Sequence, residues 1–119
     1  MKIKRGDIFF ADLSPVLGSE IGGMRDVVAV QNNELNDETS SNGGTVIVAP
    51  LSSNNAEIES RNATATMLVN IPELSLFSYR ILLYGIRAID TKRLNNYIGR
   101  LSDETMEEID KKLKYALGL

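Results

Sequence analysis

The sequence predicts a mainly β domain, a small antiparallel barrel followed by a C-terminal helix. Five short stretches rich in β-branched and aromatic residues are separated by polar loops, which is typical of a small barrel and not of βαβ units. One segment near the C-terminus, in contrast, has apolar residues at helical spacing. With 119 residues and 43% hydrophobic residues, the chain has the size and the core content of one domain spanning residues 1–119.

The first three predicted strands are Ile8–Ala11, Val27–Val30 and Thr45–Leu51. The first follows a turn signal at Gly6-Asp7. Val27–Val30 is apolar at every position, which predicts a central strand that is buried on both faces. The third is rich in β-branched residues and stops near Pro50.

The segment 32–44 is polar and rich in turn residues, so we expect a long exposed loop there, with a short helical turn around Glu34. Ala63–Val69 alternates in polarity, which predicts a half-buried fourth strand. Tyr79–Ile89 is the longest run and predicts a fifth strand. One face of this strand carries Arg80, Leu82, Tyr84 and Ile86.

The predicted C-terminal helix is Asp103–Leu117. Ser102 is placed to cap it, and acidic residues in its first turn suit the positive end of the helix dipole. Leu101 and Met106 occupy the positions of a hydrophobic staple. Gly118 marks the end of the helix.

The sequence contains neither cysteine nor histidine. This excludes disulfides, thiol nucleophiles, histidine acid–base pairs and the usual zinc ligands, so we expect no metal ion or other cofactor. A net charge of −3 argues against a broadly basic nucleic-acid-binding protein but permits a local basic groove. No apolar run approaches the roughly 20 residues of a membrane span, and no signal peptide is visible, so we expect a cytoplasmic protein.

The segment Lys4–Arg25 is the most informative part of the chain. Within it, a glycine-spaced loop carries Glu20 and leads to Arg25, which stands directly before the second predicted strand. An arginine fixed at the edge of a buried strand is well placed to hold a phosphate, because its planar fork matches two phosphate oxygens.

This segment resembles the MazF/Kid/PemK toxins of bacterial toxin–antitoxin systems, and most of all the MazF-like endoribonucleases of Gram-positive bacteria. The resemblance extends to Val46–Ser52, to the Ile86–Leu94 signature and to the C-terminal helix. It implies an SH3-like barrel of the CcdB/Kid/MazF type and a ribonuclease that cuts messenger RNA. It also implies a homodimer with single-stranded RNA in a groove across the interface, and a cognate antitoxin whose disordered acidic tail blocks that groove. Operator DNA would be bound only together with the antitoxin.

There are three catalytic candidates, and the resemblance implies the first two. Arg25 matches a catalytic arginine of the family, and Ser52 matches the position of a catalytic threonine in many relatives. Glu20 is the third, either as a general base or as a group that orients Arg25. The simpler alternatives are a salt bridge of Arg25 with Asp26 or Glu20, a turn hydroxyl at Ser52 and a solvated carboxylate at Glu20.

Four further residues are candidates for RNA contact. Ser19 lies where some relatives carry a histidine, and Arg87 belongs to the family signature. Tyr84 could stack on a base, and Arg80 could contact a phosphate. The competing interpretations are that Tyr84 only packs against its neighbours and that Arg87 has a structural role.

The chain also departs from the family pattern. Asp26 stands where proline is usual, Leu82 where some relatives have a second arginine, and Tyr84-Gly85 where an acidic residue and glutamine are common. These departures leave open a catalytically degenerate relative that only binds RNA or antitoxin. A gyrase poison of the CcdB type is less favoured, because those proteins end in Trp-Gly-Ile and this chain ends in Leu117-Gly118-Leu119.

Overall fold

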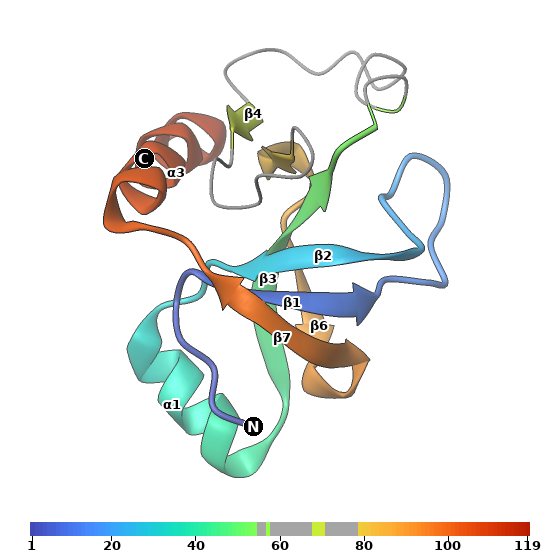
Figure 1. Cartoon of the computed structure of the whole chain (residues 1–119), viewed down its shortest axis with the longest axis vertical. Helices are drawn as coiled ribbons and strands as arrows, with labels where there is room; N and C mark the ends of the chain where they lie inside the picture. The colour runs from blue at the N-terminus through green and yellow to red at the C-terminus, as the bar shows by residue number, and fades with distance from the viewer. Residues whose placement is uncertain (55–56, 58–67, 71–78) are drawn as a thin grey trace.

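The computed structural model describes residues 1–54, 57, 68–70 and 79–119. Within these residues the strands form one antiparallel sheet, in the order β4-β5-β3-β2-β1-β7, and β6 also pairs with β3 (Figure 1). The strands are β1 (Asp7–Asp12), β2 (Met24–Ala29), β3 (Thr45–Ser52), β4 (Leu68–Asn70), β5 (Arg80–Leu82), β6 (Arg87–Asp90) and β7 (Leu94–Arg100). The helices are α1 (Asn33–Asn42) and α3 (Asp103–Leu117), with 3-10 turns η2 (Leu83–Gly85) and η3 (Thr91–Arg93). The predicted mainly β fold with a C-terminal helix is confirmed.

The second half of β2, Val27–Ala29, is buried on both faces, as its apolar sequence predicts. Val27 and Ala29 lie in one hydrophobic cluster, together with Phe9 of β1. Val28 lies in a second cluster with Ile109 of α3, which is fully buried. Because successive side chains of a strand point to opposite faces, β2 contributes to both cores and is fixed between them.

The helix α3 begins and ends as the sequence predicts. The Oγ of Ser102 accepts the backbone N–H of Thr105 at 3.2 Å, and Gly118 closes the helix in the left-handed conformation at φ 71°. Leu101 is buried and Met106 packs against the same cluster, in agreement with the predicted staple positions. In Figure 1, α3 lies beside β4 at one end of the sheet.

The prediction of an exposed loop over residues 32–44 is wrong, because this segment contains α1. Asn32 caps the helix, and Gly43 ends it at φ 76°. Asn36 is fully buried, and its side chain exchanges hydrogen bonds with the backbone carbonyl (2.8 Å) and the side chain (3.1 Å) of Gln31. A helix held by a buried amide pair has almost no apolar periodicity to reveal it.

The prediction of one continuous strand over Tyr79–Ile89 is also wrong. The chain forms β5, turns through η2 and continues as β6, so alternate residues do not share one sheet face. The turn brings Gly85 against the β1–β2 loop, where an added Cβ would lie 2.6 Å from Cδ1 of Ile21 and 3.0 Å from Cγ of Pro50. The apolar run signals burial correctly but does not reveal the change of direction.

Two other elements differ from expectation. The strand β7 was not predicted, because Asn95-Asn96 is typical of a turn and the strand lies exposed at the edge of the sheet. Of the predicted strand Ala63–Val69, residues 63–67 lie outside the described residues, whereas Leu68 and Val69 belong to β4.

Candidate functional site

Arg25 lies inside β2, and four hydrogen bonds hold its guanidinium. Nε donates to the carbonyl oxygen of Gly22 at 3.0 Å, and Nη1 donates to the carbonyl oxygen of Leu51 at 3.2 Å. Nη1 and Nη2 also bind the two carboxylate oxygens of Glu57, at 2.9 and 2.8 Å. The salt-bridge partner of Arg25 is therefore Glu57, and neither Asp26 nor Glu20 is bonded to it. The two paired side chains are only 18% and 19% exposed.

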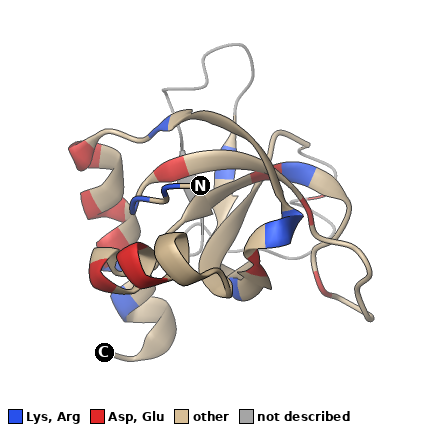
Figure 2. Cartoon of the chain, turned by 90° about the horizontal axis from the view of Figure 1, so that it is seen from below, with Lys and Arg blue, Asp and Glu red and all other residues tan. Residues whose placement is uncertain are grey.

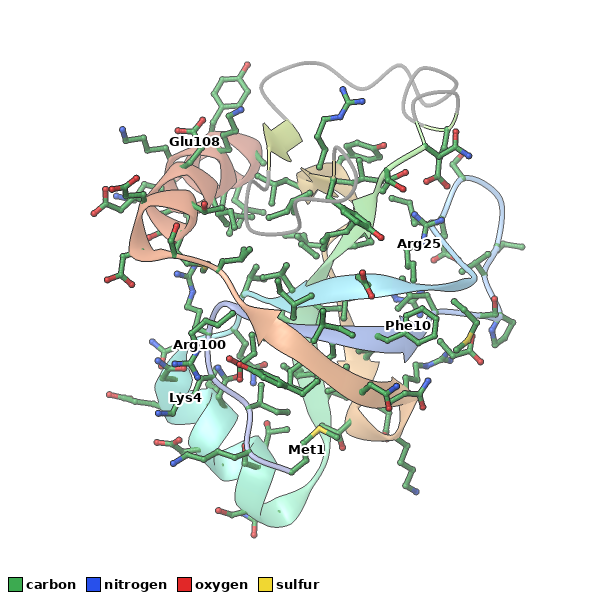
Figure 3. The ribbon with its side chains drawn as sticks, in the orientation of Figure 1. Met1, Lys4, Phe10, Arg25, Arg100 and Glu108 are labelled. Carbon is green, nitrogen blue, oxygen red and sulfur yellow. The ribbon has the colours of Figure 1, made fainter. Side chains whose placement is uncertain are left out.

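A polar pocket of about 310 Å³ opens beside this ion pair. It is lined by Phe10, Met24, Arg25, Asp26, Leu51, Ser52, Ser53, Asn54, Glu57 and Tyr79. In Figure 3, Arg25 and Phe10 lie on the same side of the molecule, and the side that carries Lys4, Arg100 and Glu108 lies opposite. The structure thus brings together the first two predicted catalytic residues, Arg25 and Ser52.

Ser52 is the last residue of β3 and is only 5% exposed. Its Oγ accepts the backbone N–H of Asn54 at 3.1 Å, so the turn role of this hydroxyl is real. A hydroxyl that accepts one hydrogen bond still has its own proton to donate. The turn role and a phosphate-binding role are therefore compatible.

Asp26 contributes a second carboxylate to the lining of this pocket. Partial burial raises the pKa of Asp26 above its ordinary value of 3.8, because burial disfavours the charged carboxylate. The departure from the family pattern at this position therefore puts an acidic group next to Arg25 in sequence and in the same pocket.

All the other predicted residues except Arg80 gather in a second pocket of about 210 Å³. It is lined by Ser19, Glu20, Ile21, Tyr84, Gly85, Ile86 and Arg87. Glu20 does not orient Arg25, because one of its oxygens accepts the backbone N–H of Leu17 at 2.6 Å and closes its own loop. Nη1 of Arg87 donates to the carbonyl oxygen of Leu13 at 3.2 Å, which supports the structural interpretation of this arginine.

Arg80 lies apart from that second group. It pairs with Ser52 across β3 and β5, so its backbone is adjacent to the Arg25 pocket, whereas Tyr84 belongs to the other pocket. The predicted pairing of Arg80 and Tyr84 on one strand face does not hold. The loop between β1 and β2 connects the two pockets, because it supplies Ser19 and Glu20 to one and the Gly22 carbonyl to the other.

Glu57 is the charged residue beside Arg25 that the sequence analysis overlooked. Its backbone N–H donates to Oδ1 of Asn54 at 3.1 Å, and an Asn-x-x-Glu spacing is the pattern of a helix-capping box. That spacing was the available signal. In the described part of the chain, no group of three or more acidic side chains could hold a metal ion.

Residues 4–117 match the family model of the PemK-like, MazF-like toxins of type II toxin–antitoxin systems. The chain belongs to this family. It is 38% identical over 120 residues to the endoribonuclease EndoA of Bacillus subtilis (strain 168), and the match covers 100% of this chain and 97% of EndoA.

Solved structures of MazF proteins share the fold. MazF of Deinococcus radiodurans matches with a TM-score of 0.80 at 20% identity, over 100% of this chain and 99% of that one. A mycobacterial endoribonuclease in complex with its cognate antitoxin matches with a TM-score of 0.71 at 21% identity, over 97% of this chain and 94% of that one. None of the helices in the described ranges of this MazF-like chain is long and apolar enough to cross a membrane.

Proposed function

We propose that this MazF-like protein is an endoribonuclease that cuts single-stranded RNA, including messenger RNA, at preferred sequences and without a metal ion. The observation that supports this most is the arginine fork of Arg25, held beside the Ser52 hydroxyl at the edge of a polar pocket. The similarity to EndoA over the full chain points to the same activity.

RNA supplies its own nucleophile for this reaction. The 2′-hydroxyl loses its proton, the O2′–P bond forms, and the P–O5′ bond breaks as the 5′-oxygen takes up a proton. The products are a 2′,3′-cyclic phosphate and a 5′-hydroxyl end. Arg25 would stabilise the charge on the non-bridging oxygens, and Ser52 would donate a further hydrogen bond.

Proton transfer requires a group within the same pocket. Glu20, which lines the other pocket, is poorly placed to take the proton from the 2′-hydroxyl. Asp26 lines the Arg25 pocket and its carboxylate is not bonded to Arg25, so we assign this proton transfer to Asp26, whose raised pKa makes it a better proton acceptor than an ordinary aspartate.

The second pocket would receive a base of the RNA near the cleavage site. Tyr84 is 36% exposed and can stack on a base, while Ser19 and Glu20 can bond its edge. Arg87 and Arg80 would add positive charge along the path of the backbone.

The partners follow from the family. A cognate antitoxin would place a disordered acidic tail over the groove; two of the similar structures are complexes with an antitoxin, which supports the existence of such a partner. The protein would act in the cytoplasm as a homodimer and bind operator DNA only together with that antitoxin.

The test is cleavage of a long RNA in EDTA by the wild type and by Arg25→Ala. We expect discrete cuts with 5′-hydroxyl ends in the wild type, and a loss of about 100-fold or more in rate in the variant, because a charge-stabilising group is removed. Lys111→Ala, which removes a cation on the exposed side of α3, is the control and should cut normally. Intact RNA with folded wild type would instead indicate the degenerate, binding-only relative.

A further inference from the structure

The carboxylate of Glu57 occupies the part of Arg25 that a phosphate would use. Its two oxygens lie 2.9 and 2.8 Å from Nη1 and Nη2, in the side-by-side arrangement that guanidinium groups also make with phosphates. The pair is mostly shielded from solvent, so water screens it weakly. An RNA phosphate and Glu57 therefore compete for the same donors.

We propose that Glu57 is an internal competitor of the substrate, which makes the Arg25 site selective for RNA that also binds outside the scissile phosphate. The proposal rests on the proposed function, because it assumes that Arg25 receives the RNA phosphate. RNA binding is then an exchange of one anion for another on the same guanidinium.

Removal of the carboxylate leaves Arg25 in place. Its Nε stays bonded to the Gly22 carbonyl, and its Nη1 stays bonded to the Leu51 carbonyl, which come from the β1–β2 loop and from β3. These two bonds fix the plane of the guanidinium without help from Glu57. An exchange of Glu57 for phosphate therefore needs no rearrangement of β2.

Glu57 competes strongly because it is tethered. Its backbone N–H is bonded to Asn54, two residues beyond the end of β3, so the carboxylate stays close to Arg25 after displacement. A tethered group acts at an effective concentration of roughly millimolar or more. A single phosphodiester carries the same charge as one carboxylate, so it has no electrostatic advantage in this competition.

Contacts at neighbouring nucleotides must then supply the additional binding free energy that displaces Glu57 from Arg25. The second pocket, with Tyr84 and Glu20, is a described place where a base could provide these contacts. Binding free energy from remote parts of the RNA thus drives the replacement of Glu57 by the phosphate on Arg25. A dinucleotide would not displace Glu57 from Arg25, whereas a longer RNA would displace it.

The experiment measures binding without cleavage. The probes are inorganic phosphate, a 2′-O-methyl dinucleotide and a 2′-O-methyl octamer of random sequence, none of which offers the 2′-nucleophile. The Nε–H resonance of Arg25 reports the site by NMR, and fluorescence anisotropy reports octamer affinity. The proteins are the wild type, Glu57→Gln, Arg25→Ala and the double variant, with Glu38→Gln on the exposed face of α1 as the charge-matched control.

We expect Glu57→Gln to bind inorganic phosphate and the dinucleotide about tenfold more tightly than the wild type does, because the tethered anion is gone. In the Arg25→Ala background the same change should have little effect, and Glu38→Gln should match the wild type. In the wild type, the octamer should shift the Arg25 resonance at concentrations where the dinucleotide does not.

Equal phosphate affinity of folded wild type and Glu57→Gln would overturn the proposal. So would a dinucleotide that shifts the wild-type Arg25 resonance as readily as the octamer does, a result that needs no variant to fold. If phosphate binding tightens in Glu57→Gln while the wild type cuts no RNA, the exchange stands and the nuclease proposal fails. If the wild type cuts RNA but the wild type and Glu57→Gln bind phosphate with equal affinity, only the proposal that Glu57 competes with the phosphate fails.

Discussion

The carboxylate of Asp26 lies where burial makes its ionised form costly. Its pKa is raised by burial, so the folded protein holds the proton to higher pH than the unfolded chain does. As pH rises through this interval, the unfolded chain ionises more readily, and the free energy of unfolding falls. The burial of the ionised Asp26 carboxylate destabilises the folded protein at neutral pH. This destabilisation is absent in acid, where the carboxyl is protonated in both the folded and the unfolded state.

We therefore expect Asp26→Asn to be more stable than the wild type at neutral pH, with the difference closing well below the ordinary carboxyl pKa. Urea unfolding at both pH values measures it. The variant should also lose RNA cleavage, since Asp26 is the proposed proton acceptor. A difference in stability that grows in acid would contradict the sign of this effect.

Residue-scale reasoning from the sequence identified two residues of the Arg25 pocket, Arg25 and Ser52. Arg25 and Ser52 were both candidates because each matches a position of the family pattern, and each lies at one end of an apolar run. Glu57 was not paired with Arg25, because the two residues are 32 positions apart and the Asn-x-x-Glu spacing indicates a cap, not an arginine partner. Glu20 was assigned to Arg25 by closeness in sequence, yet its loop folds back on Leu17.

At the scale of elements, the fit between η2 and the β1–β2 loop depends on Gly85. Any side chain there would collide with Ile21, which is 4% exposed, and would press on Pro50. Because Ile21 anchors the loop that lines the second pocket, Gly85 links the packing of η2 to the shape of that pocket.

Gly85→Ala should lower the free energy of unfolding by about 2 kcal/mol, since it overpacks a filled contact. Gly99→Ala is the matched control, because its Cβ would meet nothing within 4 Å, and it should be neutral or slightly stabilising. Urea unfolding followed by circular dichroism measures both. Adding Ile21→Val should restore part of the loss, and equal stability of the two alanine variants would contradict this packing argument.

Elements with an apolar signature were predictable, and elements held by polar contacts were not. Both β2 and α3 present apolar residues at the spacing that their burial requires, so the sequence indicates them directly. By contrast, α1 depends on the buried Gln31–Asn36 amides, and β7 pairs with β1 through its backbone while much of its side-chain surface stays exposed. Backbone hydrogen bonds between strands do not require particular residue types, so the amino-acid sequence does not reveal them.

At the scale of the whole molecule, negative charge is concentrated away from the proposed RNA site. Eight of the sixteen acidic residues lie on α1 and α3, and Figure 2 shows several red segments on these helices, with others on strands and loops. The net charge of −3 therefore says little about the potential at Arg25. The overall acidity and a local site for an anionic polymer are compatible.

The edge of the sheet offers a surface for self-association. The last strand in the sheet order, β7, exposes Tyr97 (57%) and Ile98 (44%). Exposed apolar edge strands tend to be covered by another chain. We expect light scattering to give twice the 13.1 kDa chain mass.

Ile98→Lys should shift this mass toward that of the monomer, because it places a charge on the exposed edge. Leu117→Lys is the matched control, since Leu117 is also exposed (55%) but lies at the end of α3. Wild type at the monomer mass, or equal effects of the two lysines, would argue against association through β7.

The pairing of β1 with β7 has a consequence for synthesis. Ile8 of the first strand lies opposite Gly99, and it shares a buried cluster with Ile109 near the end of the chain. A chain still growing on the ribosome therefore lacks the strand and the helix that complete its first core, and contacts so distant in sequence form late. The Arg25 strand, fixed between both cores, acquires its rigidity only after β7 and α3 have been synthesised. We therefore expect a nascent chain that lacks these two elements to have no working Arg25 site.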